Sequence, residues 1–234
     1  MRKLALPALV VLASGAAIAA AQDQPITTLT SSAKVTPTNG GTKAKPQAHK
    51  LTFNAHWETP GDVERPIVQK FVVLFPKGAL YNGGKYPKCS ANTMARGGTK
   101  ACPKGSIMGH GTGDAYADQV ITHPDITVVN GGKDKVYFYT ILNNPARVQS
   151  PVLGKITKMS GKWAYKLEAK VPEVLQIVAG VPIALRDLTV TAGSTTKDWL
   201  ATTSCTGGKW AYSVETFYST GGSATYDSST PCKK

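Results

Sequence analysis

Residues that carry catalysis or bind metals are scarce in this chain. It has 234 residues, among them four histidines and four cysteines. No two histidines stand in an H-x-H or H-E-x-x-H arrangement, and no C-x-x-C pair occurs, so the spacings typical of zinc sites are missing. A G-x-S-x-G nucleophile motif is absent as well. We therefore expect no metal, no cofactor and no catalytic set, and the composition leans away from an enzyme.

Long apolar runs are also missing, except at the N-terminus. Arg2 and Lys3 precede an alanine-rich apolar stretch at residues 4–20. This order is typical of a signal peptide, and we place its cleavage after Ala21. A transmembrane anchor is the alternative, but the run is short for a bilayer span of about 20 residues. We expect residues 1–21 to be removed and the protein to be secreted, either extracellular or associated with the cell wall, with no transmembrane segment.

The few cysteines are even in number, which fits export to an oxidising compartment where disulfides form. Of the three connectivities that four cysteines allow, we favour Cys89–Cys102 with Cys205–Cys232, because both pairs close local loops. Each bond would stabilise the fold by roughly 3 kcal/mol on the chain-entropy model. A cysteine metal site is the rival interpretation, but the four residues are far apart in the sequence.

Acidic residues are few as well: 14 against 27 lysines and arginines, for a net charge of +13. Such an excess favours contact with anionic surfaces such as cell-wall polymers, lipid headgroups or polysaccharide. The alternative is a merely soluble surface, because lysines are spread along the whole chain and no arginine cluster occurs. We expect no specific nucleic-acid partner.

The pattern of apolar residues predicts an all-β protein. Residues 22–50 are rich in Thr, Ser, Lys, Pro and Gly, which is typical of a flexible basic linker, although a strand at 26–29 stays open. From Leu51 onward, period-two alternation recurs in about nine or ten short strands separated by glycine-rich turns, one of them at Asn130 and the two glycines after it. We expect residues 51–234 to form a single antiparallel β-sandwich, immunoglobulin-like or jelly-roll.

The stretch at residues 75–114 is too polar and too rich in glycine and proline for a helix or a long strand. We interpret it as a surface loop tied off by Cys89–Cys102, and its lysines as a candidate contact surface for an anionic polymer. These lysines are Lys77, Lys85, Lys88, Lys100 and Lys104.

Two alternatives concern the same region. His110 is a candidate binding residue, and a free Cys102 beside it would make a thiol nucleophile and a base, although a disulfide would remove the thiol. Asp114, Asp118 and Asp125 would be ligands for a calcium ion if they met in one loop, and a solvated loop edge if they did not.

A short repeat is visible in the second half of the chain. The pentapeptide GKWAY occurs at residues 161–165 and again at 208–212. In both copies the alternation puts aromatic side chains on one face of a strand. Exposed, Trp163 and Trp210 would be candidate carbohydrate platforms; buried, they would be core residues.

Several segments resemble a group of uncharacterised secreted proteins of high-GC Gram-positive bacteria. They are FPKG, PKCS and ACPKGSIMGHG in the first half, and the tail that begins with CTGGKWAY and ends with the last cysteine. The resemblance covers residues 71–113 and 204–232. It implies export and paired cysteines, and no activity or catalytic residue comes with it.

Together these features predict a secreted, non-enzymatic β-sandwich that binds an anionic polymer or carbohydrate at the cell surface or cell wall. A secreted hydrolase acting on polysaccharide or ester substrates is one alternative. A structural surface protein without a ligand is the other.

Overall fold

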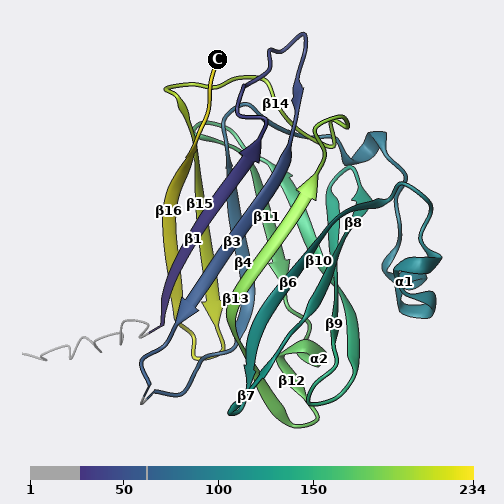
Figure 1. The fold of residues 1–234 in the computed structure, drawn as a ribbon, viewed down its shortest axis with the longest axis vertical. Coiled ribbons are helices and arrows are strands. Elements are labelled where there is room, and N and C mark those ends of the chain that lie inside the picture. The colour runs from purple at the N-terminus through teal and green to yellow at the C-terminus, as the bar shows by residue number, and fades with distance from the viewer. Residues whose placement is uncertain (1–26, 62) are drawn as a thin grey trace, which may run out of the picture.

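The all-β prediction is confirmed. The computed structural model describes residues 27–61 and 63–234, so the predicted signal peptide at 1–21 and the start of the predicted linker lie outside the described residues. The described chain consists mainly of antiparallel strands, with two short α-helices and two single turns of 3-10 helix (Figure 1).

Most strands belong to one continuous antiparallel sheet of thirteen strands. Eleven of them follow one another in the order β1 (Thr28–Thr36), β3 (Lys50–Glu58), β13 (Val181–Gly193), β6 (Ile107–Ala117), β8 (Asp125–Gly132), β9 (Lys135–Leu142), β10 (Val148–Lys158), β11 (Trp163–Lys170), β4 (Val68–Pro76), β15 (Lys209–Tyr218) and β16 (Ser223–Pro231). Two short strands, β7 (Val120–Thr122) and β12 (Ile177–Val178), pair with β6 and β13.

This sheet curls until its first and last strands meet, so the fold is nearly closed and barrel-like. Just beyond the last residues of β1 and β16, the amide of Gly40 donates a hydrogen bond to the carbonyl of Lys233 at 2.8 Å. The described residues form sixteen strands, fourteen of them (β3 to β16) from Lys50 onward, where about nine or ten were predicted, and most belong to one continuous sheet and not to two facing sheets. Each strand keeps pairing with the next around the circle, which leaves only two edges.

Small elements cover both ends of the barrel-like sheet. At the end drawn uppermost in Figure 1, β2 (Gln47–Ala48), β14 (Leu200–Thr202) and β5 (Ala79–Tyr81) form a separate three-stranded sheet. At the lower end, the helix α2 (Glu173–Gln176) and β12 bring Leu175 and Val178 into the core. We call these the upper and lower ends from here on.

The prediction of a flexible linker at residues 22–50 is wrong for its described part. Residues 28–36 form the edge strand β1, and every one of them pairs with β3. Leu29 is buried, and Ala33 packs beside it in the same core cluster. Inward and outward side chains alternate strictly along β1, but the outward ones are Thr, Ser and Lys. The average composition of the segment is therefore polar and does not indicate a strand.

The prediction of a surface loop closed by Cys89–Cys102 is confirmed in part. The disulfide is present, with an S–S distance of 2.07 Å. Contrary to the prediction, the loop contains three short helical segments: η1 (Gly83–Lys85), α1 (Ala91–Gly97) and η2 (Thr99–Ala101). Helix α1 begins after Ser90, whose side chain accepts a hydrogen bond from the Thr93 amide at 3.1 Å. We call residues 82–106 the excursion.

The second predicted disulfide, Cys205–Cys232, is also present. It connects the segment after β14 to the residue that follows β16, and both sulfurs pack with the buried Trp210. No helix among the described residues is long and apolar enough to cross a membrane.

Candidate functional site

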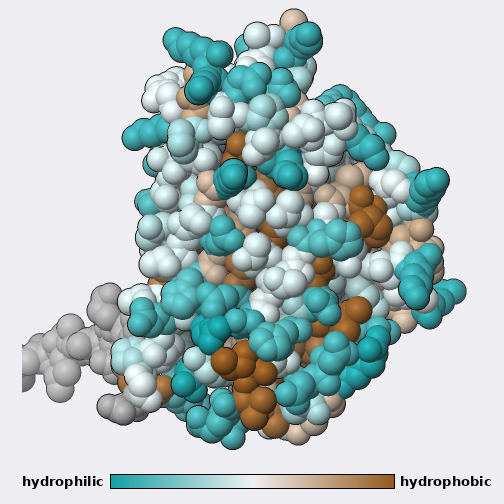
Figure 2. Space-filling model, viewed as in Figure 1, coloured by the Kyte–Doolittle hydropathy of each residue, from teal (hydrophilic) through white to brown (hydrophobic). Residues whose placement is uncertain are grey.

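The interior of the barrel-like sheet is apolar and contains free space. Alternation along each strand sends one set of side chains inward, such as Phe53 on β3, Phe71 on β4 and Phe138 on β9. Between them lies a cavity of about 300 Å³ whose lining is almost wholly apolar. The outer wall carries the other set and is mostly polar or neutral in the view of Figure 2.

The buried side chains around this cavity fall into separate clusters. The buried interior residues form three clusters, centred on Leu142 and Leu175 toward the lower end, on Trp57 and Tyr212, and on Trp199 toward the upper end. Half-buried Phe138, Leu185 and Leu188 each pack against two of these clusters. Phe53, Phe71 and Phe138 point inward and yet are only half-buried, because they border the space between the clusters.

The cavity is long. On β13 its lining runs from Ile183 to Ala192, and a bulge at Arg186 keeps the residues on both sides of it facing inward. Nine residue steps at about 3.4 Å, tilted by about 40° to the axis, correspond to roughly 20–25 Å. Averaged over this length, a volume of about 300 Å³ corresponds to a narrow cross-section.

His49 and Thr202 form a buried polar pair in the upper part of the cavity wall. The His49 ring is 3% exposed and lies 5.2 Å from the Trp210 ring. Its Nδ1 donates to the Pro37 carbonyl at 2.9 Å, and its Nε2 accepts from the Thr202 hydroxyl at 2.9 Å. Burial lowers the pKa of His49, and the bond to Pro37 opposes this only partly. The neutral ring therefore adds a satisfied polar group, not a charge, to the apolar wall.

A groove opens on the surface at the upper rim. It lies between the turn that joins β4 to β5 and the turn that joins β10 to β11, and its volume is about 320 Å³. Ala79, Leu80 and Tyr165 line both the groove and the interior cavity. All three are half-buried. They form the wall between the surface groove and the interior.

The rim of the groove combines cations with apolar side chains. Lys77 and Lys158 line it and are exposed. Met159, which is 41% exposed, lies between the strands of the same hairpin. The ammonium of Lys162 lies 4.6 Å from the centre of the Trp163 ring. Within the described residues, none of these three lysines forms an ion pair with an acid.

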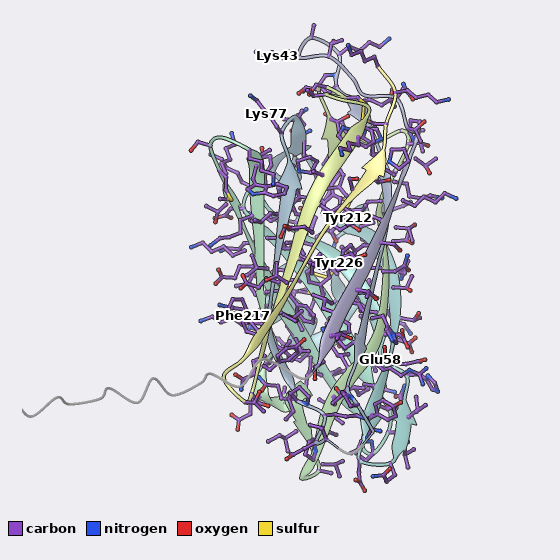
Figure 3. All side chains as sticks on the ribbon, turned by 90° about the vertical axis from the view of Figure 1, so that its left-hand side faces the viewer. Lys43, Glu58, Lys77, Tyr212, Phe217 and Tyr226 are labelled. Carbon is purple, nitrogen blue, oxygen red and sulfur yellow. A yellow bond between two sulfur atoms is a disulfide. The ribbon has the colours of Figure 1, made fainter. Side chains whose placement is uncertain are left out.

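The position of Lys77 is fixed by the residue that follows it. Gly78 has a φ of 89°, which favours glycine. Its carbonyl accepts a hydrogen bond from the Thr203 amide at 2.8 Å, and any β-carbon at this position would meet the hydroxyl of Ser204. The turn is therefore held against the upper three-stranded sheet, and Lys77 stands at its tip (Figure 3).

The structure brings together only two of the predicted contact residues, Lys77 and Trp163, which both line the groove. The other four lysines belong to the excursion, which packs beside the barrel on β8 and β9. Lys85 is ion-paired with Asp198 at 2.6 Å. This contact, together with a hydrogen bond from Tyr86, lowers the pKa of Asp198 against the opposing effect of burial.

Two candidate residues have other roles. Trp210 is 3% exposed, and its ring nitrogen donates to the Ser204 carbonyl at 2.9 Å, so it is a core residue and not a binding platform. His110 is exposed on the outer wall, on β6 between Thr191 and Thr127. Because Cys102 is in a disulfide, the thiol and base alternative is wrong.

The outer wall also carries a chain of contacts between acidic and basic side chains. His56 contacts Asp187 at 2.7 Å, Arg186 contacts Asp187 and Asp114, and His123 contacts Asp114 at 2.7 Å. Burial raises the pKa of Asp187, but hydrogen bonds from His56 and Arg186 outweigh it and lower that pKa. Asp114 is therefore engaged by Arg186 and His123, and residues 27–61 and 63–234 contain no group of three side chains placed to bind a metal ion.

Comparison with known proteins adds no relative. No family model matches the chain, and no curated protein or solved structure is significantly similar to it. The cavity and the groove are therefore the observations on which a function can rest. Sequence patterns mark neither, because Ala79, Leu80 and Tyr165 are ordinary strand residues that meet only because β4 pairs with β11.

Charge differs between the two ends. The loops and the chain end at the upper end, leaving the excursion aside, carry Lys43, Lys45, Lys77, Lys133, Lys162, Lys197, Lys233 and Lys234 against the acids Asp134 and Asp198. The lower loops carry Arg65 and Arg147 against Glu64, Asp118 and Glu173. Figure 3 shows Lys43 and Lys77 at the upper end and Glu58 toward the lower end. The groove therefore opens at the basic end.

Proposed function

We propose that this protein is a non-enzymatic binding protein whose interior holds an elongated apolar ligand. The observation that carries this proposal is the long cavity of about 300 Å³ with an almost wholly apolar lining. Small-molecule sites are typically concave, mostly apolar and about 300–1,000 Å³ in volume. Barrels of moderate size use the same kind of space for one small ligand.

The energetics favour occupation of the cavity. At about 24 cal/mol per Å³, the free-energy cost of an empty space of 300 Å³ is about 7 kcal/mol. The net stability of a domain is only about 5–15 kcal/mol. A ligand that fills the space restores the lost contacts. The narrow shape favours a single alkyl or acyl chain over a broad ring system.

The test measures binding of a neutral apolar dye, N-phenyl-naphthylamine, by its fluorescence in the oxidised full-length protein. Leu188 lines the cavity and is half-buried, so Leu188→Trp should fill the space and weaken dye binding at least tenfold. Leu74 is also half-buried but does not line the cavity, so Leu74→Trp is the matched control and should bind as the unmodified protein does. An unmodified protein that binds no dye, or a Leu188→Trp variant that binds it unchanged, would contradict the proposal.

A second candidate function is contact with an anionic polymer or carbohydrate at the cell surface, which the sequence predicts. The observation that favours it is the concentration of lysines at the upper end, with few acids near them. Lys77→Glu with Lys162→Glu should weaken binding to an immobilised anionic polysaccharide in low salt. Lys88→Glu with Lys104→Glu tests the excursion in the same assay, and unchanged binding in both double variants would exclude this function.

A further inference from the structure

We propose that the ligand is an anionic amphiphile with one apolar chain, and that it enters through the groove at the upper rim. This inference rests on the proposed function, since it assumes an apolar ligand in the cavity. It adds the entry route, the chemical class of the head group and the residues that recognise it.

The entry route follows from the shared wall. Ala79, Leu80 and Tyr165 have one side toward the groove and the other toward the cavity. Along the strand order from β1 to β16 backbone pairing is continuous, and side chains such as Leu29 and Tyr212 fill the space between these two edge strands. Ala79 is the smallest of the three side chains, and the short strand β5 that carries it pairs only with β14. A chain that displaces this segment slightly passes from the groove into the interior.

The class of the head group follows from the rim. An apolar chain inside the cavity leaves its polar end at the groove, where Lys77 and Lys158 are the charged lining residues. Neither has an acidic partner within the described chain, so both ammonium groups are available to an anion. The same rim presents Trp163 and Met159, which suit the first methylenes below the head group. A carboxylate or a phosphate monoester fits this arrangement, because lysine binds either as a point charge.

The surrounding charge supports the same class. The upper end carries many lysines and few acids, so an anion that approaches it is attracted before it reaches the groove. Inside, the lining holds no charged residue, and its one histidine is kept neutral by burial. The interior therefore accepts only the apolar part of the ligand, and the charged part stays at the rim.

The experiment compares three ligands with the same chain, dodecanoate, dodecyl phosphate and dodecanol, by displacement of N-phenyl-naphthylamine. Lys77→Gln with Lys158→Gln should weaken binding of both anions about tenfold, as expected for the loss of two partly exposed charge contacts, and leave dodecanol within twofold. The matched control is Lys100→Gln with Lys104→Gln on the excursion, which should change none of the three. Whichever of dodecanoate and dodecyl phosphate binds the unmodified protein more tightly identifies the head group.

The route is tested separately by association kinetics. Ala79→Trp should slow the association of all three ligands at least tenfold, whereas Ser160→Trp, at an exposed turn position that lines neither space, should not. Equal loss of dodecanol and of the anions in the lysine variant would overturn the head-group assignment, and unchanged kinetics in Ala79→Trp would overturn the route. If none of the ligands displaces the dye, the proposed function fails together with this inference. Dodecanol binding without any preference for anions overturns this inference alone.

Discussion

At the scale of single residues, Asn130 connects the excursion to the barrel. It is fully buried, and its side-chain amide donates to the carbonyls of Gly83, Tyr86 and Pro87 at 2.9–3.2 Å. Its side-chain oxygen accepts from the ring nitrogen of Trp199 at 3.1 Å. A single side chain thus satisfies buried polar groups from several segments at once.

Replacing Asn130 with aspartate should strongly destabilise the protein. The carboxylate would lie buried against three carbonyl oxygens that now accept hydrogen bonds from the amide, and the charge would repel them. We expect Asn130→Asp to lower the free energy of unfolding by about 3–5 kcal/mol, measured by urea denaturation at pH 7. The control is Asn143→Asp at an exposed position, where Arg147 already contacts the side chain, and this variant should lose no stability.

His49 makes stability depend on pH between neutral and mildly acidic conditions. Burial lowers its pKa below the ordinary value of 6.5, so the unfolded chain binds a proton more readily than the folded one. The contribution of His49 to stability is therefore complete above pH 6.5 and is lost as pH falls toward the folded pKa. We expect the urea midpoint to fall from pH 7.5 to pH 5.5 and this fall to be smaller in His49→Gln. The exposed His110 provides the control, since an equal flattening by His110→Gln would contradict the assignment to His49.

At the scale of the elements, the two GKWAY strands show how context decides the role of identical residues. They are β11 and β15, and both pair with β4, one on each side. In β15, Trp210 and Tyr212 are both buried. In β11, a register shift between Trp163 and Tyr165 leaves the tryptophan at the surface groove and the tyrosine in the wall of the cavity.

This contrast marks what a sequence can predict about such a fold. Alternation correctly places Leu51, Phe53 and Trp57 on the inner face of their strand, and local loop closure correctly pairs the cysteines. Alternation does not say which strands pair at the edges of a sheet, so it cannot distinguish two facing sheets from one that curls on itself. The cavity depends on that closure and the groove on the pairing of β4 with β11, and for this reason the lining of neither could be predicted.

Local signals were also misleading in two places. Asn130 and the following two glycines are a common turn signal, but here they end β8, and the turn comes after them. Residues 28–36 have a polar composition typical of linkers, yet they form β1 because their inward side chains complete the core beside Trp57 and Tyr212. Tertiary contacts decided both cases.

The Cys89–Cys102 bond should hold the excursion and contribute little to the barrel. The half of the excursion that this disulfide closes contains α1, whose one buried side chain is Met94. In Cys89→Ala with Cys102→Ala, we expect trypsin to cleave after Arg96 or Lys100 under conditions that leave the unmodified protein intact. Removal of the cross-link should reduce stability by at most about 3 kcal/mol. Far-ultraviolet circular dichroism should keep its β signal, and collapse of that signal would show that the excursion is integral to the barrel.

At the scale of the whole molecule, the two edge strands form a seam in the wall. β1 and β16 run in the same direction, and within the described chain backbone hydrogen bonds join the two edges only above the strands, around Asn39 and Lys233. Below that point side chains fill the seam. The Tyr212 hydroxyl donates to the carbonyl of Ser31 at 3.2 Å, and Leu29 packs in the same cluster as Tyr226. Figure 3 views the molecule from this side, with Tyr212 and Tyr226 at mid-height.

The seam should be the least protected part of the sheet in hydrogen exchange. In an antiparallel pair, alternate residues direct their backbone groups away from the partner strand, and the bond from Tyr212 shows that Ser31 directs its carbonyl into the seam. The amides of Ser31 and Ala33 therefore lack a strand partner, whereas the amides of β13, which lies between β3 and β6, have partners on both sides. We expect exchange at pH 7 to be at least a hundredfold faster for the seam amides, because they exchange by local opening while β13 requires global unfolding.

Binding of an apolar chain should slow exchange in β13 more than at the seam, since the ligand stabilises the whole folded state and does not supply the missing partners. Equal protection of β1 and β13 in the free protein would mean that the sheet closes completely in solution, and the seam would then be no feature of the folded molecule.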